Sequence, residues 1–465
     1  MTVEDWRRPE ARDGLLRDFR SGTVRPATLG QSAITHLRAN WPATDAALAA
    51  DELLAQVLVS VPIYPQWLEG RLTGLRRRLL FGDGVEALGP LLPNLAIQCH
   101  LNEYAWALDA IERQLVERMA GRIERLTPAE VMAVACYRPL SGIPGADVLL
   151  ARSWTDPERA VLEEQLVAAR EEQALVAQIP AITPIRGGVS QTVRAQYEEH
   201  PYPRWRHVTP MPTAGSIFGW RIPEGVEVLF AGCGTGHHAI HAGQRYGPTA
   251  KVLAVDLSRA SLAYALRKTR AAGIGNMTYA QADLLELGGI GRTFDVIECS
   301  GVLHHLADPF EGARVLSALL RPGGVMKIAL YSAIARVKLG PAKALAKQYG
   351  PDTIRELRQA IIAAPDGDPV KAAMGTTDFY STSSLRDLIM HVQEHEMAVA
   401  DLQRMVDENG LAFTAFAIGA ETLATYRATF PGDPAATDLA NWDAFERANP
   451  TTFGGMYQFW VRKPA

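Results

Sequence analysis

The segment from Val226 to Ile240 constrains the fold of this chain more than any other. The apolar run Val226–Ala231 has the length and composition of a buried strand, and it leads directly into Gly232, Gly234 and Gly236. Such a turn needs residues without a Cβ, because its backbone N–H groups must approach a ligand closely. The helix expected to follow has a partial positive charge at its N-terminus, which favours an anionic or polar ligand group there.

The spacing of these glycines separates two classes of ligand. A dinucleotide-binding fingerprint has glycine at its first, third and sixth positions. The sixth position of this turn is His237. A nicotinamide-dependent dehydrogenase is therefore disfavoured.

Strand-like and helix-like segments alternate from residue 226 onward, the pattern of a parallel sheet covered by helices on both faces. The further predicted strands are Lys251–Asp256, Met277–Ala280, Phe294–Cys299, Val325–Leu330, Leu411–Ile418 and Met456–Arg462. Asp256 closes the second strand, Asp283 follows the third, and a polar stretch from Ser300 to His305 follows the fourth. The carboxyl ends of parallel strands meet at the edge where open α/β sheets bind ligands. We therefore expect the glycine turn and these polar residues to share one site. Asp256 is placed to accept hydrogen bonds from two ribose hydroxyls, although it could instead cap the following helix.

Composition excludes several broad classes of protein. With 465 residues and 48% apolar residues, the chain is large enough for two or three domains with cores of their own. A formal net charge of -4 argues against general nucleic-acid binding. The sequence contains no run of 18 apolar residues, so no membrane span is expected. The charged N-terminus MTVEDWRRPEARDG does not resemble a secretory signal. Four scattered cysteines are typical of a reducing, cytoplasmic environment.

The predicted organisation has three parts. Residues 1–180 are expected to form an α-helical accessory domain that binds a partner or substrate or forms a homodimer; Thr127 and Glu130, for example, have the spacing of a capping box. Residues 181–225 are a linker. Its Tyr197, Tyr202 and Arg204 belong either to a packed connector or to a lid over a cationic ligand, since aromatic faces attract positive charge. Residues 226–465 hold the sheet, with a mostly helical insertion at 332–410.

The insertion contains the pentad His391-Val392-Gln393-Glu394-His395. If the pentad is helical, two histidines four residues apart share a helix face and could bind Zn²⁺, with Glu394 as a base. No third ligand is identifiable, so no metal is assigned, and His391 and His395 remain weak candidates. Acceptor binding, together with Tyr380 and Arg386, and purely structural hydrogen bonding are the alternatives.

Several stretches, in this order, resemble the motifs of class I S-adenosylmethionine-dependent methyltransferases. They are AGCGTG, LAVDLS, QADLLEL, FDVIECSGVLHHLADP and LRPGG. More narrowly, LAIQCHLNEYAWA, QYEEHPYPRW, DFYSTSSLRDLIMHVQEH and the C-terminal DLANWDAFERANPTTFGGMYQFWVRK are similar to a bacterial subgroup whose members often carry tetratricopeptide repeats; no such repeat is apparent here. The resemblance implies a Rossmann-like α/β sheet of seven strands with strand seven antiparallel, and S-adenosyl-L-methionine as the cofactor.

The resemblance also implies roles for individual residues. Gly232, Gly234 and Gly236 would hold the methionine portion of the cofactor. Asp256 and Leu257 would lie at the ribose, and Ala282 and Asp283 at the adenine, with Ser300 also beside the cofactor. Two positions depart from the family pattern. Phe230 stands where many members have an acidic residue, and His237 stands where the subgroup has glutamine; its imidazole could bind the cofactor or only cap the surface.

Methyl transfer to a protonated acceptor needs a general base. A histidine suits this role, because its unperturbed pKa near 6.5 is close to working pH. His304 is the first catalytic candidate, with His305 and Glu298 behind it; a core or capping role is the alternative for His304. The acceptor, a small molecule or a peptide side chain, is not identified by the sequence. Two other functions remain open: a non-catalytic cofactor-binding scaffold or sensor, and a zinc hydrolase.

Overall fold

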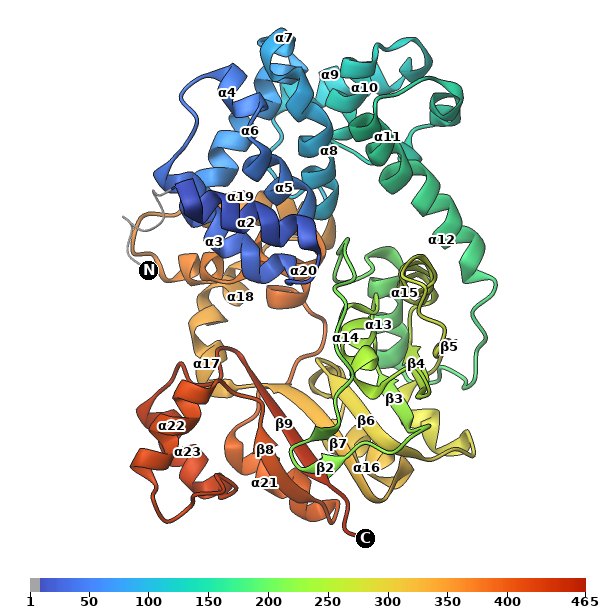
Figure 1. Cartoon of the computed structure of the whole chain (residues 1–465), viewed down its shortest axis with the longest axis vertical. Coiled ribbons are helices and arrows are strands. Elements are labelled where there is room, and N and C mark those ends of the chain that lie inside the picture. The colour runs from blue at the N-terminus through green and yellow to red at the C-terminus, as the bar shows by residue number, and fades with distance from the viewer. Residues whose placement is uncertain (1–8) are drawn as a thin grey trace. The chain divides into compact units, whose positions relative to one another are not determined.

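The computed structural model describes residues 9–465, without the side chains of Pro9 and Val189. Residues 1–8, on which part of the N-terminal signal-peptide prediction rests, lie outside the described residues. The chain divides into two compact units (Figure 1). One contains residues 9–173 together with Arg204–Pro210 and Ala342–Met390. The other contains Ala174–Pro203, Met211–Pro341 and His391–Ala465. Among the described residues, no helix combines the length and the apolar character that crossing a membrane requires.

The first unit is helical, as predicted for the N-terminal part of the chain. Its helices are α2 (Pro9–Ser21), α3 (Pro26–Ala39), α4 (Asp45–Ala49), α5 (Glu52–Ser60), α6 (Gln66–Leu80), α7 (Val85–Leu88), α8 (Leu92–Leu101), α9 (Ala110–Ala120), α10 (Pro128–Ala135), α11 (Asp156–Leu162), α19 (Ile354–Ala363) and α20 (Thr382–Ile389). Helix α12 (Ala168–Val176) and helix α18 (Gly340–Ala346) each run across a boundary between the units. The predicted capping box is present at α10: the Thr127 and Glu130 side chains each accept a hydrogen bond from the other residue's backbone N–H.

Much of the predicted insertion belongs to this helical unit. Arg358 of α19 is almost fully buried, and its guanidinium donates to both carboxylate oxygens of Glu69 in α6, at 2.7 and 2.5 Å. Its Nε donates to the carbonyl of Phe379 at 2.9 Å. The prediction kept the whole insertion 332–410 within the domain that holds the sheet. In the structure, Ala342–Met390 belongs to the helical unit instead.

The second unit is built on a seven-stranded sheet with the strand order β5-β4-β3-β6-β7-β9-β8. The strands are β3 (Glu227–Ala231), β4 (Lys251–Asp256), β5 (Met277–Gln281), β6 (Phe294–Ser300), β7 (Leu320–Tyr331), β8 (Ala412–Phe416) and β9 (Met456–Arg462). The first five are parallel, and β9 runs antiparallel between β7 and β8. This confirms the Rossmann-like α/β fold and its antiparallel last strand. A separate hairpin pairs β1 (Ser216–Ile217) with β2 (Trp220–Arg221).

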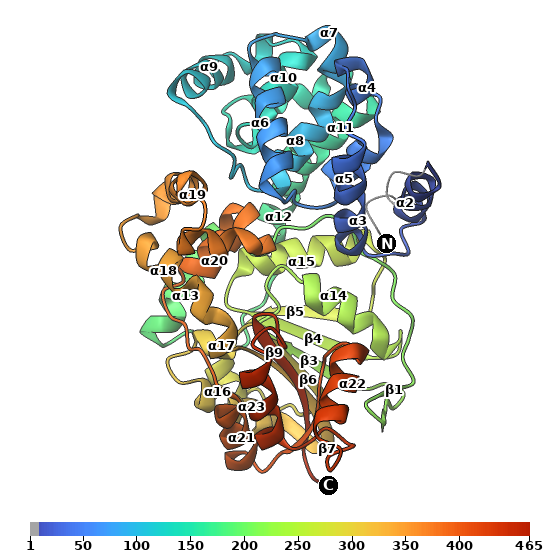
Figure 2. The same ribbon diagram turned by 90° about the vertical axis from the view of Figure 1, so that its left-hand side faces the viewer.

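Helices cover both faces of this sheet (Figure 2). On one face, the apolar side chains of the strands pack with α16 (Pro309–Leu319), α21 (Val399–Glu408) and α23 (Leu439–Ala448) in one continuous core. Helices α14 (His237–Gly243) and α15 (Arg259–Ala271) are the crossovers from β3 to β4 and from β4 to β5. The remaining helices of the unit are α13 (Gly188–Glu199), α17 (Ala333–Arg336) and α22 (Ala420–Thr429).

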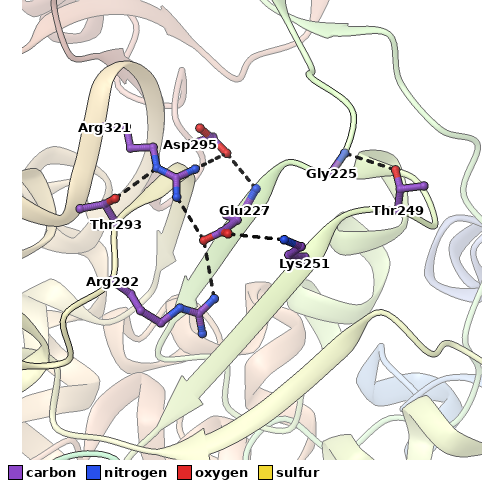
Figure 3. Close-up of polar contacts among 8 residues, drawn as sticks. All are labelled: Gly225, Glu227, Thr249, Lys251, Arg292, Thr293, Asp295 and Arg321. Atoms are coloured by element: carbon purple, nitrogen blue, oxygen red, sulfur yellow. Dashed lines mark hydrogen bonds and ion pairs between the residues drawn. The ribbon is translucent and has the colours of Figure 1, made fainter.

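An ion-pair network holds the strands together at their amino ends (Figure 3). Glu227 of β3 pairs with Lys251 of β4 and with Arg321 of β7, at 3.9 and 3.2 Å. Arg321 also pairs at 2.8 Å with Asp295 of β6, which accepts the backbone N–H of Glu227 at 2.9 Å. The network joins four strands at the edge opposite their carboxyl ends, which leaves the carboxyl edge to the functional groups.

Candidate functional site

The glycine turn lies between β3 and α14, and neighbouring atoms explain why it needs glycine. A Cβ on Gly234, whose φ is +53°, would lie 2.7 Å from the carbonyl oxygen of Tyr202. A Cβ on Gly236, whose φ is +81°, would lie 2.7 Å from the Cβ of Ala265 in α15. The turn therefore combines a backbone conformation that side chains rarely adopt with close packing on two sides.

Asp256, at the end of β4, meets this turn directly. One carboxylate oxygen accepts the N–H of Gly234 at 2.8 Å, and the other accepts the N–H of Ser258 at 3.0 Å. Burial raises the pKa of Asp256 above its ordinary value, while these two hydrogen bonds act in the opposite direction. A carboxylate has about four acceptor sites, so that of Asp256 can accept hydrogen bonds from two further donors, such as hydroxyl groups.

The end of β5 lies next to the end of β4. The N–H of Ala282 donates to the carbonyl of Asp256 at 3.0 Å. Asp283 is buried, and its carboxylate caps the short helix η7 (Leu284–Gly289) by accepting the N–H of Leu285 at 3.2 Å. Leu257, between the two strands, accepts a hydrogen bond from Gln281 at its carbonyl. The glycine turn and the two acidic strand ends thus form one continuous group.

Ser300, the last residue of β6, and His304, in the stretch after it, lie at the same carboxyl edge. His304 lies in η8 (Leu303–His305), is fully buried, and stacks on Tyr331 at the end of β7 with ring centroids 3.9 Å apart. Neither of its ring nitrogens, nor the Ser300 hydroxyl, has a hydrogen-bond partner among residues 9–465. Burial, with smaller contributions from nearby histidines and Arg336, lowers the pKa of His304 well below its ordinary value. This imidazole is therefore neutral at pH 7.

The pentad residues pack against His304 and His305, but not on a helix. Helix α20 ends at Ile389, and residues 391–395 have no helical structure. The N–H of His395 donates to the carbonyl of His304 at 2.8 Å, and the ring of His391 stacks on that of His305 with centroids 3.5 Å apart.

Glu394 is held by an ion pair to Arg336, at 2.6 Å. The zinc interpretation assumed that His391 and His395 share one face of a helix. That assumption was wrong, because residues 391–395 are not helical. The loop folds back because its backbone groups bond to the strand ends; the N–H of Met397 donates to the carbonyl of Tyr331 at 2.9 Å.

Glu298 is enclosed within the sheet. It is 1% exposed, accepts a hydrogen bond from the Tyr246 hydroxyl, and lies 2.7 Å from Nε2 of His238 in α14. Burial alone would raise its pKa, but the hydrogen bond and charge of His238, with the charges of Arg245 and Lys327, lower it to about 2. A carboxylate with this pKa and two partners is poorly suited to act as a general base.

The other predicted residues fall into both units. His237 is exposed at the start of α14, where its ring makes an edge contact with His241. Tyr197 and Tyr202 belong to the unit with the sheet; the Tyr197 ring lies 6.1 Å from that of His391.

The remaining three belong to the helical unit. There Arg204 lies 3.0 Å from Nε2 of His100, the buried Tyr380 donates to the carbonyl of Met374 at 3.2 Å, and Arg386 donates to the carbonyl of Pro351 at 2.9 Å.

Sequence reasoning missed four residues at the carboxyl edge: Thr183, Glu198, Tyr331 and Arg336. Tyr331 directly follows the predicted strand Val325–Leu330, and that position alone could have marked it. The guanidinium of Arg336 stacks on the Tyr331 ring at 3.8 Å. Thr183 and Glu198 lie in the linker, and no local pattern distinguishes them from their neighbours.

Comparisons with known proteins agree with this geometry. Residues 228–324 match the family described as "Methyltransferase domain". An uncharacterized protein of Synechococcus, syc1184_c, is 27% identical over 49% of this chain and 60% of its own length. The ubiquinone/menaquinone biosynthesis C-methyltransferase UbiE of Escherichia coli is 30% identical over 34% of this chain and 68% of its own length.

Among solved structures, PKMT2 from Rickettsia typhi in complex with AdoHcy covers 57% of this chain and 53% of its own, with 17% identity and a TM-score of 0.41. The chain thus spans only part of the relatives that it matches. The tetratricopeptide subgroup is not among these findings. The methyltransferase-domain match, the identity to UbiE and the seven-stranded sheet together place this chain in the family of class I S-adenosylmethionine-dependent methyltransferases.

Proposed function

We propose that this protein moves a methyl group from S-adenosyl-L-methionine to a nucleophile on a small molecule or a peptide side chain. The observation that carries the proposal is the 2.8 Å hydrogen bond from Gly234 to Asp256, because it joins the glycine turn and the acidic strand end in one place. When bound, the cofactor supplies an activated methyl group and its leaving group. The protein needs to hold the acceptor in line and to exclude water.

The residues present fit this cofactor. The turn at Gly232, Gly234 and Gly236 has a positive φ at all three glycines and carries no Cβ, so its backbone can approach a ligand closely. Asp256 has acceptor sites left for ribose hydroxyls, with Leu257 beside it. Asp283, next to Ala282, offers a carboxylate to the adenine amine. His237 and Ser300 border the same edge.

His304 is the proposed base or orienting group for the acceptor. An imidazole whose two nitrogens are buried without partners leaves hydrogen-bonding groups unmet, at a cost of about 1–3 kcal/mol each. An acceptor that donates a hydrogen bond to one nitrogen would meet that need, and the low pKa keeps the ring neutral, so that this nitrogen can accept the bond at neutral pH. Tyr197, His305, His391 and His395 form the proposed wall around it. Glu298 is assigned a structural role instead.

The main competing function is a scaffold that binds the cofactor without catalysis. Titration of the protein with S-adenosylhomocysteine tests the cofactor site. Incubation with S-adenosylmethionine labelled in the methyl group, in a bacterial extract, tests for transfer.

We expect wild-type protein to bind S-adenosylhomocysteine and to label a component of the extract. Asp256→Ala should lose binding at least tenfold, since each lost hydrogen bond to a charged group is worth about 1.5–3 kcal/mol. His304→Ala should bind normally but transfer no label. Binding without any transfer by the wild type would favour the scaffold.

The remaining features of the proposal concern the whole chain. Cys99, Cys136, Cys233 and Cys299 are all free thiols, which supports a reducing, cytoplasmic setting. The net charge of -4 supports a partner other than nucleic acid. A homodimer through the helical unit remains a prediction, and sedimentation equilibrium of the purified chain would decide it.

A further inference from the structure

Residues 180–203, which we name the strap, are bonded to all three turns of the proposed cofactor site. At its beginning, the strap runs beside the last residues of β5. The N–H of Gln281 donates to the carbonyl of Pro180 at 2.8 Å, and the N–H of Ile182 donates to the carbonyl of Gln281 at 3.0 Å. The hydroxyl of Thr183 accepts the N–H of Asp283 at 2.8 Å, so the strap also touches the proposed adenine residue.

The end of helix α13 caps the beginning of α15. Both carboxylate oxygens of Glu198 accept backbone N–H groups of the first turn, from Arg259 at 2.9 Å and from Ala260 at 3.1 Å. The hydroxyl of Ser258 accepts the next N–H of that turn and donates to the carbonyl of Tyr197 at 2.9 Å. A carboxylate at a helix N-terminus satisfies donors that otherwise lack partners and complements the helix dipole.

The last residues of the strap hold the glycine turn. Thr235 donates its N–H to the carbonyl of Tyr202 at 3.3 Å and its hydroxyl to the carbonyl of Pro203 at 2.5 Å. Asp256 links Gly234 to Ser258 through its two oxygens. The hydrogen bonds therefore form a closed circuit, from α13 through Ser258, Asp256 and the glycine turn back to the strap.

The same helix faces the proposed acceptor wall. The Tyr197 ring lies 6.1 Å from the ring of His391, at an interplanar angle of 44°. His391 stacks on His305, which follows His304 in η8. Adjacent residues of α13 thus contact different parts of the proposed site. Glu198 binds the first turn of α15, next to Asp256, and Tyr197 lies near the acceptor wall at His391.

We infer that Glu198 is a positioning residue for the cofactor, and that α13 couples cofactor binding to order in the acceptor wall through Tyr197. The inference rests on the proposed function. A helix that is held at both contacts has less freedom left to lose, so a ligand that orders it at Glu198 lowers the cost of ordering it at Tyr197. The circuit holds the turn at Asp256 and Ser258 in place, and removal of Glu198 leaves two amides of α15 without their acceptor.

The test of Glu198 uses calorimetric titration with S-adenosylhomocysteine. Glu198→Ala is expected to weaken binding about tenfold, the scale of a lost helix cap. Glu198→Gln, which keeps one acceptor oxygen, should lie between the alanine variant and the wild type.

The matched control is Glu199→Gln, an exposed neighbour that loses the same charge and should bind as the wild type does. Thermal unfolding of the apo proteins verifies that every variant folds. Equal affinity of Glu198→Gln, Glu198→Ala and Glu199→Gln would overturn the positioning role while leaving the proposed function intact. A wild type that does not bind would overturn both.

The test of coupling uses amide hydrogen exchange with and without S-adenosylhomocysteine. In the wild type, the ligand should slow exchange at the amides of His395 and Met397, whose acceptors lie at the acceptor wall. Tyr197→Leu keeps the backbone contact with Ser258, so its affinity should stay within about twofold, and the added protection at these amides should disappear. Protection that persists in this variant, or a wild type that binds the ligand without protection there, would sink the coupling.

Discussion

At the scale of single residues, Glu298 of β6 places a buried carboxylate beside Phe230 of the neighbouring strand β3. Many class I members have an acidic residue at the position of Phe230, and in the register of β3 with β6 Glu298 lies directly across from it. The side chain is bonded to Tyr246 and His238, which follow the glycine turn in sequence. It therefore ties the segment after the turn to the middle of the sheet.

A pH dependence follows from the low pKa of Glu298. The folded-state pKa is about 2, below the ordinary glutamate value of 4.5, so this group contributes stability that is fully present above the unfolded-state pKa. That contribution is lost as the pH falls from about 4.5 toward about 2. Urea unfolding between about pH 6 and pH 3 should show a smaller loss of stability in Glu298→Gln than in the wild type. A variant at the exposed Glu421 of α22, Glu421→Gln, serves as the control and should follow the wild type.

At the scale of elements, the packing of α14 on α15 depends on Gly236. A Cβ at position 236 would lie 2.7 Å from the Cβ of Ala265, on the face of α15 that packs against the glycine turn. Any side chain here pushes α15 away, and α15 begins only three residues beyond Asp256. The distance between the turn and the acidic strand end is therefore set partly by this contact.

Gly236→Ala and Gly273→Ala separate backbone strain from a packing clash. Gly273 has a φ of +67° and open space around it, so its alanine variant should lose about 1–2 kcal/mol from strain alone. Gly236→Ala should lose a further 1–3 kcal/mol, roughly the cost of overpacking, and should weaken S-adenosylhomocysteine binding. Chemical denaturation and titration measure the two effects. Equal losses of stability at both sites would contradict the role given to the Ala265 contact.

At the scale of the whole molecule, the helical unit is assembled from segments far apart in the chain. The ion pair between Glu69 and Arg358 joins positions 289 residues apart, and both side chains are buried. Removing one member of such a pair leaves the other as a buried charge without a partner, which is strongly destabilising. Replacing both members by apolar residues leaves no unpaired charge.

Glu69→Ala should accordingly destabilise the helical unit by about 3–5 kcal/mol, whereas Glu69→Leu combined with Arg358→Met should recover most of the loss. Hydrogen exchange in α6 and α19 reports this unit separately from the sheet. Asp443→Ala, which breaks the exposed pair of Asp443 with Arg447, is the control and should change stability by less than about 1 kcal/mol. Full additivity of the two substitutions at the buried pair would argue against a paired charge.

The sequence by itself determined where the strands lie along the chain, the glycine turn and the acidic strand ends, because each of these is encoded by local periodicity and by turn chemistry. Every strand of the sheet was predicted, β4 and β9 with the bounds that the structure has and the others with shifted ends; β7 begins at Leu320 instead of Val325, and Leu320 pairs there with Phe294 of β6.

Only the tertiary structure decided which distant segments complete the site and the helical unit. Glu198 and Thr183 meet the turns of the proposed cofactor site through contacts across 61 and 100 residues, and no local pattern records such pairings. The histidine pentad shows the same limit, because its spacing implies a shared face only on a helix. The N–H of His395 bonds instead to the carbonyl of His304 after β6, and the N–H of Met397, two residues beyond the pentad, bonds to that of Tyr331 at the end of β7.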